Sequence, residues 1–280
     1  MIEEVINCLL EQEEGLHDFG DGNGLVPAHR HRNPDGTFGG WVANTAYVSI
    51  ESYVTAHSEV FGKARVYRGA KIRYFSKVYD SAEVYNGAEV RDHAQVFGNA
   101  RVHGANTEVH TDALVYGDAE VSGGALVRCG AEVYERAVVR GYVVVYGGAK
   151  IYGRAKIEGG GLGSVEILEG TEVFGDVSIT TYSTDIVFGG EGVKVYDQES
   201  LMKAIVQSGG RLSTTHLLPW EVEAQDLFFS KADELGYDTT LSNLEDFLTW
   251  VEAVGATAAP PSERKKVLLK ALEDWAEEMQ

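Results

Sequence analysis

The sequence predicts a mainly β protein: a three-sided solenoid of about seven coils of short parallel strands, with a short helix before it and a helical module after it. Three observations predict this fold. Aliphatic residues recur every six positions from Val48 to Ile179, with one inserted residue near Asn106 and one longer break at the glycines 159–161. A small residue, most often Ala, stands two positions before many of them. The chain also holds 33 glycines but only 5 prolines in 280 residues.

Each six-residue unit is interpreted as one strand and one corner. Residues two apart on a strand point to the same side, so the Ala and the aliphatic residue both face the interior. Pairs such as Gly98-Asn99 and Gly117-Asp118 follow the strands, and such residues adopt the left-handed backbone conformation that a tight corner needs. Three units make one triangular coil of 18 residues, and successive coils stack about 4.8 Å apart. The solenoid is expected over residues 41–196.

The two ends are expected to be different in structure. A solenoid needs caps over its open ends, and residues 2–12 are predicted to form a short amphipathic cap helix within an entry segment, 1–40. Residues 197–280 are predicted to be an acidic α-helical module. Asp197 is expected to cap a helix from Gln198, and Ser262 to cap the last helix. Two further helices are expected over EVEAQDLFFSKADELG and LSNLEDFLTWVEAVG. The apolar face of the last helix is expected to comprise Val267, Leu268, Leu272 and Trp275.

Composition narrows the classes of function. The net charge of -19 lies mainly in the two ends, because acids and bases nearly balance over residues 41–180. General nucleic-acid binding is therefore disfavoured. No apolar run is long enough to span a membrane, and the acidic N-terminus has no basic region typical of a secretory signal. The two cysteines lie far apart and predict no disulfide or metal framework. A cytoplasmic protein is expected.

The repeat resembles the hexapeptide-repeat, left-handed parallel β-helix proteins. It is most similar to the long solenoids with A-x-V-Y-G-N-A-x-V repeats in bacterial and phage genomes, most of which have no assigned function. The resemblance covers residues 41–180 and implies left-handed winding. That family includes acyltransferases, γ-class carbonic anhydrases and non-catalytic scaffolds, and trimers are usual in it.

The 18-residue period places the residue after each core aliphatic on one of three outer faces. One face is expected to carry an aromatic ring on each coil. Stacked rings stabilise any parallel sheet, and a stripe of exposed rings is also typical of a contact surface, here for another copy of the chain or for another protein. The predicted interface residues are Phe61, Tyr79, Phe97, Tyr116, Tyr134 and Tyr152.

A second face is largely cationic. Arg73, Arg91 and Arg128 are interpreted either as a solvated face or as an anion-binding site. On the third face, Arg and Glu alternate at 65, 83, 101 and 120, and these residues are expected to pair between coils.

Enzymatic interpretations are less well supported by the sequence. An acyltransferase needs a catalytic His and, in the family, a projecting loop, but His57, His93, His103 and His110 adjoin no long insertion. A zinc site needs converging imidazoles, whereas His93, His103 and His110 fall at different phases of the repeat. EGGGLGS lacks the Lys-Ser/Thr of a phosphate loop. The His and Asp residues of the entry segment could hold a metal, although loop composition explains them equally well: His17, Asp18, Asp21, His29 and His31.

The expected function is therefore that of a non-enzymatic, protein-binding scaffold without catalytic residues, metal or cofactor, acting as a homo-oligomer, dimer or trimer. The resemblance to phage-borne proteins suggests an inhibitor that occupies a host protein, whose basic surface the acidic ends would meet. The alternatives are a hexapeptide-repeat acyltransferase and a binder of small anionic ligands between subunits.

Overall fold

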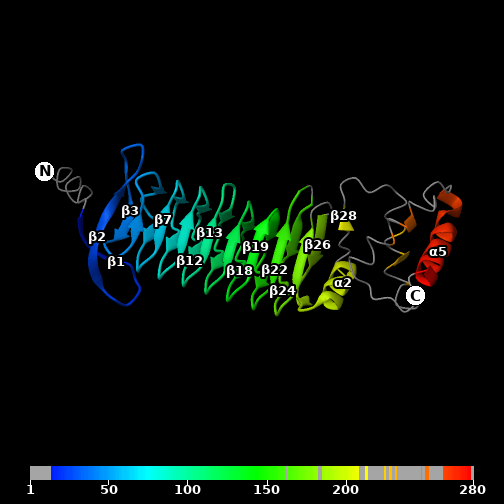
Figure 1. Ribbon diagram of the computed structural model, residues 1–280. Helices are drawn as coiled ribbons and strands as arrows, with labels where there is room; N and C mark the ends of the chain where they lie inside the picture. Colours follow the sequence, from blue (N-terminus) through cyan, green and yellow to red (C-terminus); the bar gives the residue numbers. More distant parts are fainter. Residues whose placement is uncertain are drawn as a thin grey trace.

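A computed structural model describes residues 14–161, 163–181, 185–207, 212–213 and 261–278, with a few single residues between 224 and 251. The described chain is a mainly β, parallel solenoid, as the sequence predicts, and it has about eight turns and two described helices (Figure 1). The count exceeds the predicted seven because strands continue through residues 178–195, where the six-residue repeat becomes irregular.

Three sheets form the walls of the solenoid, and each coil contributes one strand to each sheet. Sheet A contains eleven strands: β1 (Glu14–Asp18), β2 (Leu25–Arg32), β3 (Phe38–Ala43), β6 (Glu59–Val60), β9 (Lys77–Val78), β12 (Gln95–Val96), β15 (Leu114–Val115), β18 (Glu132–Val133), β21 (Lys150–Ile151), β24 (Glu172–Val173) and β27 (Lys194–Val195). Sheet B contains eight: β4 (Tyr47–Val48), β7 (Arg65–Tyr67), β10 (Glu83–Tyr85), β13 (Arg101–His103), β16 (Glu120–Ser122), β19 (Val138–Gly141), β22 (Lys156–Gly159) and β25 (Ser178–Thr181). Sheet C contains nine: β5 (Tyr53–Val54), β8 (Lys71–Ile72), β11 (Glu89–Val90), β14 (Glu108–Val109), β17 (Leu126–Val127), β20 (Val143–Val145), β23 (Val165–Leu168), β26 (Asp185–Gly189) and β28 (Leu212–Ser213).

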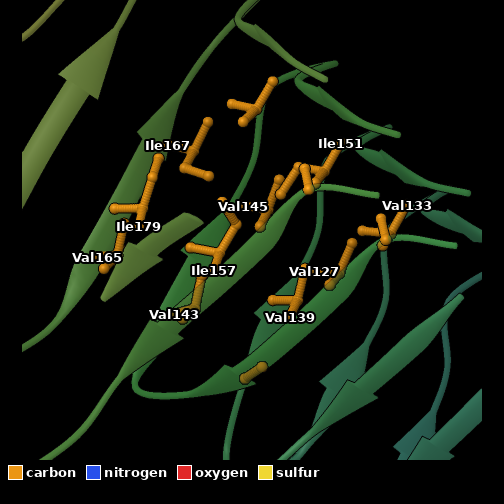
Figure 2. Packing of buried hydrophobic residues seen from close by; sticks show 14 of the residues in the cluster. Val127, Val133, Val139, Val143, Val145, Ile151, Ile157, Val165, Ile167 and Ile179 are labelled. Carbon is orange, nitrogen blue, oxygen red and sulfur yellow. The ribbon is translucent and has the colours of Figure 1, made fainter. Parts of the chain in front are cut away.

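The aliphatic residues of the repeat fill the interior. Val84, Val102 and Val121 are directly aligned on neighbouring strands of sheet B and are fully buried. Figure 2 shows the same arrangement further along the rod, where side chains from the three sheets meet inside the coil. Burying one such side chain contributes about 1.5–3 kcal/mol, so the aligned core both stabilises the rod and sets its register.

The corners use positive backbone φ angles, as expected. Residues other than glycine also adopt this conformation, including Asn86 (φ 56°) and Asp112 (φ 61°). Glycine is required sterically where the next coil comes very close. A Cβ atom at Gly141 would fall on the carbonyl oxygen of Gly159, far inside van der Waals contact.

The N-terminal end contains antiparallel strands that the sequence analysis did not predict. β1 pairs with β2, and β2 with β3, so the entry segment extends sheet A. Phe19 follows β1 and packs with Ala28, Ala43 and Phe61 in a small second apolar cluster outside the main core. The predicted cap helix over residues 2–12 lies outside the described residues.

Two helices are described after the solenoid. α2 (Gln198–Gln207) begins as predicted, with Asp197 Oδ1 accepting a hydrogen bond of 2.8 Å from the Ser200 backbone N–H. α5 (Pro261–Glu278) starts earlier than predicted, so the assignment of Ser262 as its N-cap is wrong. Proline suits the first turn of a helix because its φ is already helical and it lacks an N–H that would need a partner.

The buried side of α5 matches the expected apolar face. Leu268, Leu272 and Trp275 are buried, and Val267 is half-buried. The Trp275 ring lies 5.8 Å from that of Phe228 and 5.7 Å from that of Phe247. The rest of the two predicted middle helices lies outside the described residues. Among the residues described, no helix is both long and apolar enough to cross a membrane.

Candidate functional site

The structure places all six predicted interface rings in one stack on the outer face of sheet A. Successive ring centroids are 4.8 to 4.9 Å apart and nearly parallel. Two further rings continue the stack at steps of 5.1 and 5.6 Å. We refer to these eight residues as the ring column: Phe61, Tyr79, Phe97, Tyr116, Tyr134, Tyr152, Phe174 and Tyr196.

The rings are less exposed than the sequence analysis assumes. Each covers a face of its neighbours, so the rings from Tyr79 to Tyr152 are half-buried rather than fully exposed. Phe61 is only 5% exposed because Phe19 stacks on it at 4.8 Å. The ring column therefore presents a row of ring edges to its surroundings.

Hydroxyl groups tie the ring column to the neighbouring residues of sheet A. Tyr79 Oη donates to Gln95 Oε1 at 3.1 Å, and Tyr116 Oη donates to Glu132 Oε2 at 3.0 Å. Burial of the phenol, followed by the bond to Glu132 and the charge of that carboxylate, raises the pKa of Tyr116. The hydroxyls are therefore neutral hydrogen-bond donors at physiological pH.

The predicted arginine site on sheet C is only partly available. Arg73 lies 3.5 Å from Glu89, and Arg91 is paired with Glu108 at 2.9 Å and with Asp92. These two arginines are therefore neutralised by carboxylates of the same chain. Arg128 differs: its guanidinium stacks over the Tyr146 ring at 5.6 Å and has no carboxylate partner among the described residues.

Sheet B shows the expected pairing between coils. Arg65 lies 3.8 Å from Glu83, and Arg101 lies 2.9 Å from Glu120. Arg140 also donates to Glu120, at 2.7 Å, and these cations together with His103 lower the pKa of Glu120 despite its burial. These charged groups are occupied by structural contacts.

The histidines considered for catalysis or metal binding lie on different surfaces. His103 stacks on Tyr85 in sheet B, His93 stacks on Phe75 at a corner, and His110 follows β14 of sheet C and is buried. In the described part of the chain, no group of three His, Cys, Asp or Glu residues has the geometry to hold a metal ion.

The His and Asp residues of the entry segment also make separate contacts with different partners. His17 lies 2.8 Å from Glu59, His29 lies 3.0 Å from Asn44, and His31 bonds to the Ser52 carbonyl at 2.9 Å. Asp18 and Asp21 accept bonds from nearby backbone N–H groups, those of Gly20 and Asn23.

An open groove of about 720 Å³ lies on the outer face of sheet C. Its walls come from four successive coils, at β11, β14, β17 and β20, and from the two places where the repeat is interrupted. The sequence analysis missed it, although apolar Leu126 and Val144 at outward positions were an available signal. The residues that line it include Arg91, Asn106, Glu108, His110, Leu126, Arg128, Tyr142, Val144, Gly161, Gly163 and Ser164.

The two missed rings occupy the same place in the repeat as the six predicted ones, directly after a core aliphatic residue, here Val173 and Val195. Phe174 and Tyr196 each follow the preceding ring by 22 residues instead of 18, because of the longer coils there. The contact of Phe19 with Phe61 at the start of the column had no signal in the repeat, since Phe19 precedes it.

Comparisons of the chain with models of known protein families, with curated proteins and with solved structures each give no match. The assignment of function therefore depends on the geometry of this chain.

Proposed function

We propose that this protein is a non-enzymatic binding scaffold that associates with a second copy of itself through the outer face of sheet A. The observation that carries the proposal is the ring column, whose eight rings follow one another along a single face. Tyr and Phe are enriched in protein interfaces. Rings already held by stacking lose little side-chain freedom on binding, which lowers the entropic cost of association.

The charges beside the ring column favour a second copy as the partner. The residue before each core aliphatic on sheet A forms a series along the rod. In a dimer with its two-fold axis parallel to the strands, this series runs in opposite directions in the two copies. Glu59 then faces Lys194, and Lys77 faces Glu172. The ion pairs within each chain, Lys77 with Glu59 at 2.7 Å and Lys194 with Glu172 at 3.4 Å, therefore meet with opposite charges opposed. The series is Glu59, Lys77, Gln95, Leu114, Glu132, Lys150, Glu172 and Lys194.

Sedimentation of a double variant tests the proposal. Tyr116→Ser/Tyr134→Ser removes two adjacent rings from the centre of the column, and we expect the dimer to dissociate. Tyr67→Ser/Tyr85→Ser is the matched control, since these two rings also stack, at 4.9 Å, but on sheet B. A monomeric wild-type chain, or a sheet A variant with unchanged mass, would rule the proposal out.

A charge exchange tests the orientation. Lys77→Glu should weaken association because two carboxylates would then face each other in the dimer. Lys77→Glu/Glu172→Lys should recover part of it. Lys156→Glu on sheet B is the control for the change in net charge and should leave the association unchanged.

The proposal extends to the family of the solenoid, the hand of its winding and a second partner. The Ala-x-Val spacing supports membership of the hexapeptide-repeat family, and the resemblance to that family implies left-handed winding, which an experimental structure would test. The net charge of -19, which lies mainly in the two ends, supports a basic protein as an additional partner. In this proposal the chain acts in the cytoplasm as an inhibitor that occupies the partner protein. If so, a purified complex should dissociate as salt concentration rises.

A further inference from the structure

The two interruptions of the repeat lie at the same groove. Asn106 is the single inserted residue, and Gly161 and Gly163 belong to the longer break, yet all three line the groove on sheet C. The stacking is regular across both interruptions, because β11 pairs with β14 and β20 pairs with β23 without a shift in register. Their convergence on one surface marks it as a built site.

The floor of the groove is apolar. It is formed by Leu126 and Val144, which point outward from β17 and β20. At the equivalent position, the preceding coils carry Lys71, Glu89 and Glu108 and the next coil carries Glu166, while Val187 on β26 lies beyond the groove lining. Tyr142, which is 59% exposed, stands beside this floor and adds a third apolar surface.

One wall of the groove presents an unpaired cation. Arg128 has no carboxylate partner among the described residues, and its Nε is buried without a hydrogen bond. Arg91 also lines this wall, but Glu108 and Asp92 neutralise it. The described lining therefore carries one uncompensated positive charge beside an apolar floor.

We propose that this groove binds a small molecule that carries a single carboxylate on an apolar body. The carboxylate pairs with the guanidinium of Arg128, whose planar fork matches a carboxylate in a bidentate geometry. The apolar body lies over Leu126 and Val144, against Tyr142. The volume of about 720 Å³ is in the range of small-molecule sites.

The charges favour a monoanion over a phosphate. Glu108 lines the groove, and Asp92 lies beside Arg91, so a dianion would meet two carboxylates at short range. A monocarboxylate matches the one free cation. A simple ammonium compound would be repelled by Arg128.

His110 supplies a second donor next to Arg128. Its Nδ1 lies 2.8 Å from Thr111 Oγ1. The tautomer that accepts the hydroxyl proton at Nδ1 carries its own proton on Nε2, which can donate to an anion. The groove is on sheet C, so this site is independent of the dimer proposed through sheet A.

A titration with octanoate tests the proposal. Binding is measured by calorimetry and by changes in the amide signals of Gly124, Gly161 and Gly163. We expect saturable binding and shifts confined to these glycines and their neighbours. Octyl phosphate should bind more weakly and octylammonium should not bind. Octyl phosphate binding as tightly as octanoate would contradict the choice of a monoanion.

Two variants locate the site. Arg128→Gln should weaken octanoate binding at least about tenfold, the usual loss for a hydrogen bond to a charged group. Arg73→Gln is the matched control, in the same column but outside the groove, and should bind as the wild type does. Equal affinity of both variants, or no saturable binding by the wild type, would overturn the proposal.

A substitution in the groove floor tests whether a loss of binding could result from a loss of folding. Leu126→Glu places on β17 the residue type that β11 and β14 carry at the same position, so the coil should fold. We expect octanoate binding to be lost while the solenoid keeps its circular dichroism spectrum. Retained binding would show that the apolar floor is not part of the site.

Discussion

Glu132 joins three successive coils, because it contacts the hydroxyl of Tyr116 on one side and Lys150 on the other. Tyr116 Oη, on the coil before, donates to Glu132 Oε2 at 3.0 Å, and Lys150 Nζ, on the coil after, lies 3.0 Å from Oε1. Glu172 repeats the arrangement with Tyr152 at 3.1 Å and Lys194 at 3.4 Å. The carboxylates beside the ring column therefore hold both the rings and the next coil.

Removal of the Tyr116 hydroxyl should destabilise the solenoid slightly. Tyr116→Phe keeps the ring in the stack but loses the bond to Glu132, which we expect to cost about 1 kcal/mol. Tyr134→Phe is the matched control, because the Tyr134 hydroxyl has no hydrogen bond to any described residue. Urea unfolding midpoints measure the difference. Equal midpoints for the two variants would show that the hydroxyl bond contributes nothing.

The solenoid should lose stability at alkaline pH. Burial, the hydrogen bond to Glu172 and the charge of that carboxylate raise the pKa of Tyr152 to about 12, whereas a tyrosine in the unfolded chain titrates near about 10. The folded state thus holds the phenol proton more tightly. The resulting stability is complete below pH of about 10 and falls as pH rises toward about 12.

Ultraviolet absorbance of the phenolate and denaturant midpoints across this range check the prediction. Tyr116→Phe/Tyr152→Phe should show a smaller loss than the wild type. If every tyrosine titrated near pH of about 10 without any change in the midpoint, the prediction would be wrong.

Two corner glycines should respond very differently to alanine. Gly141 (φ 72°) and Gly130 (φ 74°) have the same backbone conformation. Gly130 has open space where a Cβ would be, whereas a Cβ at Gly141 would clash with the Gly159 carbonyl oxygen. We expect Gly130→Ala to cost about 1 kcal/mol and Gly141→Ala about 3 kcal/mol or more. Thermal and urea unfolding compare them, and similar losses would refute the steric argument.

Octanoate affinity should increase as the pH falls toward the pKa of His110. Burial, and then Arg91 and Arg128, lower that pKa, while Glu108 and Asp92 oppose the shift. A bound carboxylate favours the imidazolium, so it raises the pKa and binding takes up a proton. The affinity for octanoate should therefore rise as the pH falls from the higher pKa of His110 in the complex to its lower pKa in the free protein.

Calorimetry at several pH values, in buffers of different ionisation enthalpy, detects this proton uptake. His110→Asn should bind octanoate with an affinity that no longer changes over the same range. An identical pH dependence in wild type and variant would exclude His110 as the titrating group.

The sequence by itself determined the coil, the core and the faces. A period of six with Ala and Val two apart admits only one alternation of inward and outward side chains, so the stacking of Tyr79, Phe97 and Tyr116 followed from their spacing of one coil. The pairing of Arg101 with Glu120 followed in the same way. These contacts join residues that the repeat places at equivalent positions.

Only the tertiary structure decided which of these residues are available. Arg73, Arg91 and Arg128 look equivalent in the repeat. The carboxylates near the first two come from the neighbouring column of sheet C, Glu89 and Glu108, and from the adjacent corner, whereas Arg128 has no carboxylate partner among the described residues. The groove likewise required the inserted Asn106 and the distant Gly161 to come together across several coils. An inserted residue does not follow the six-residue period. The direction in which it points therefore depends on packing against neighbouring coils, and no local sequence pattern encodes that direction.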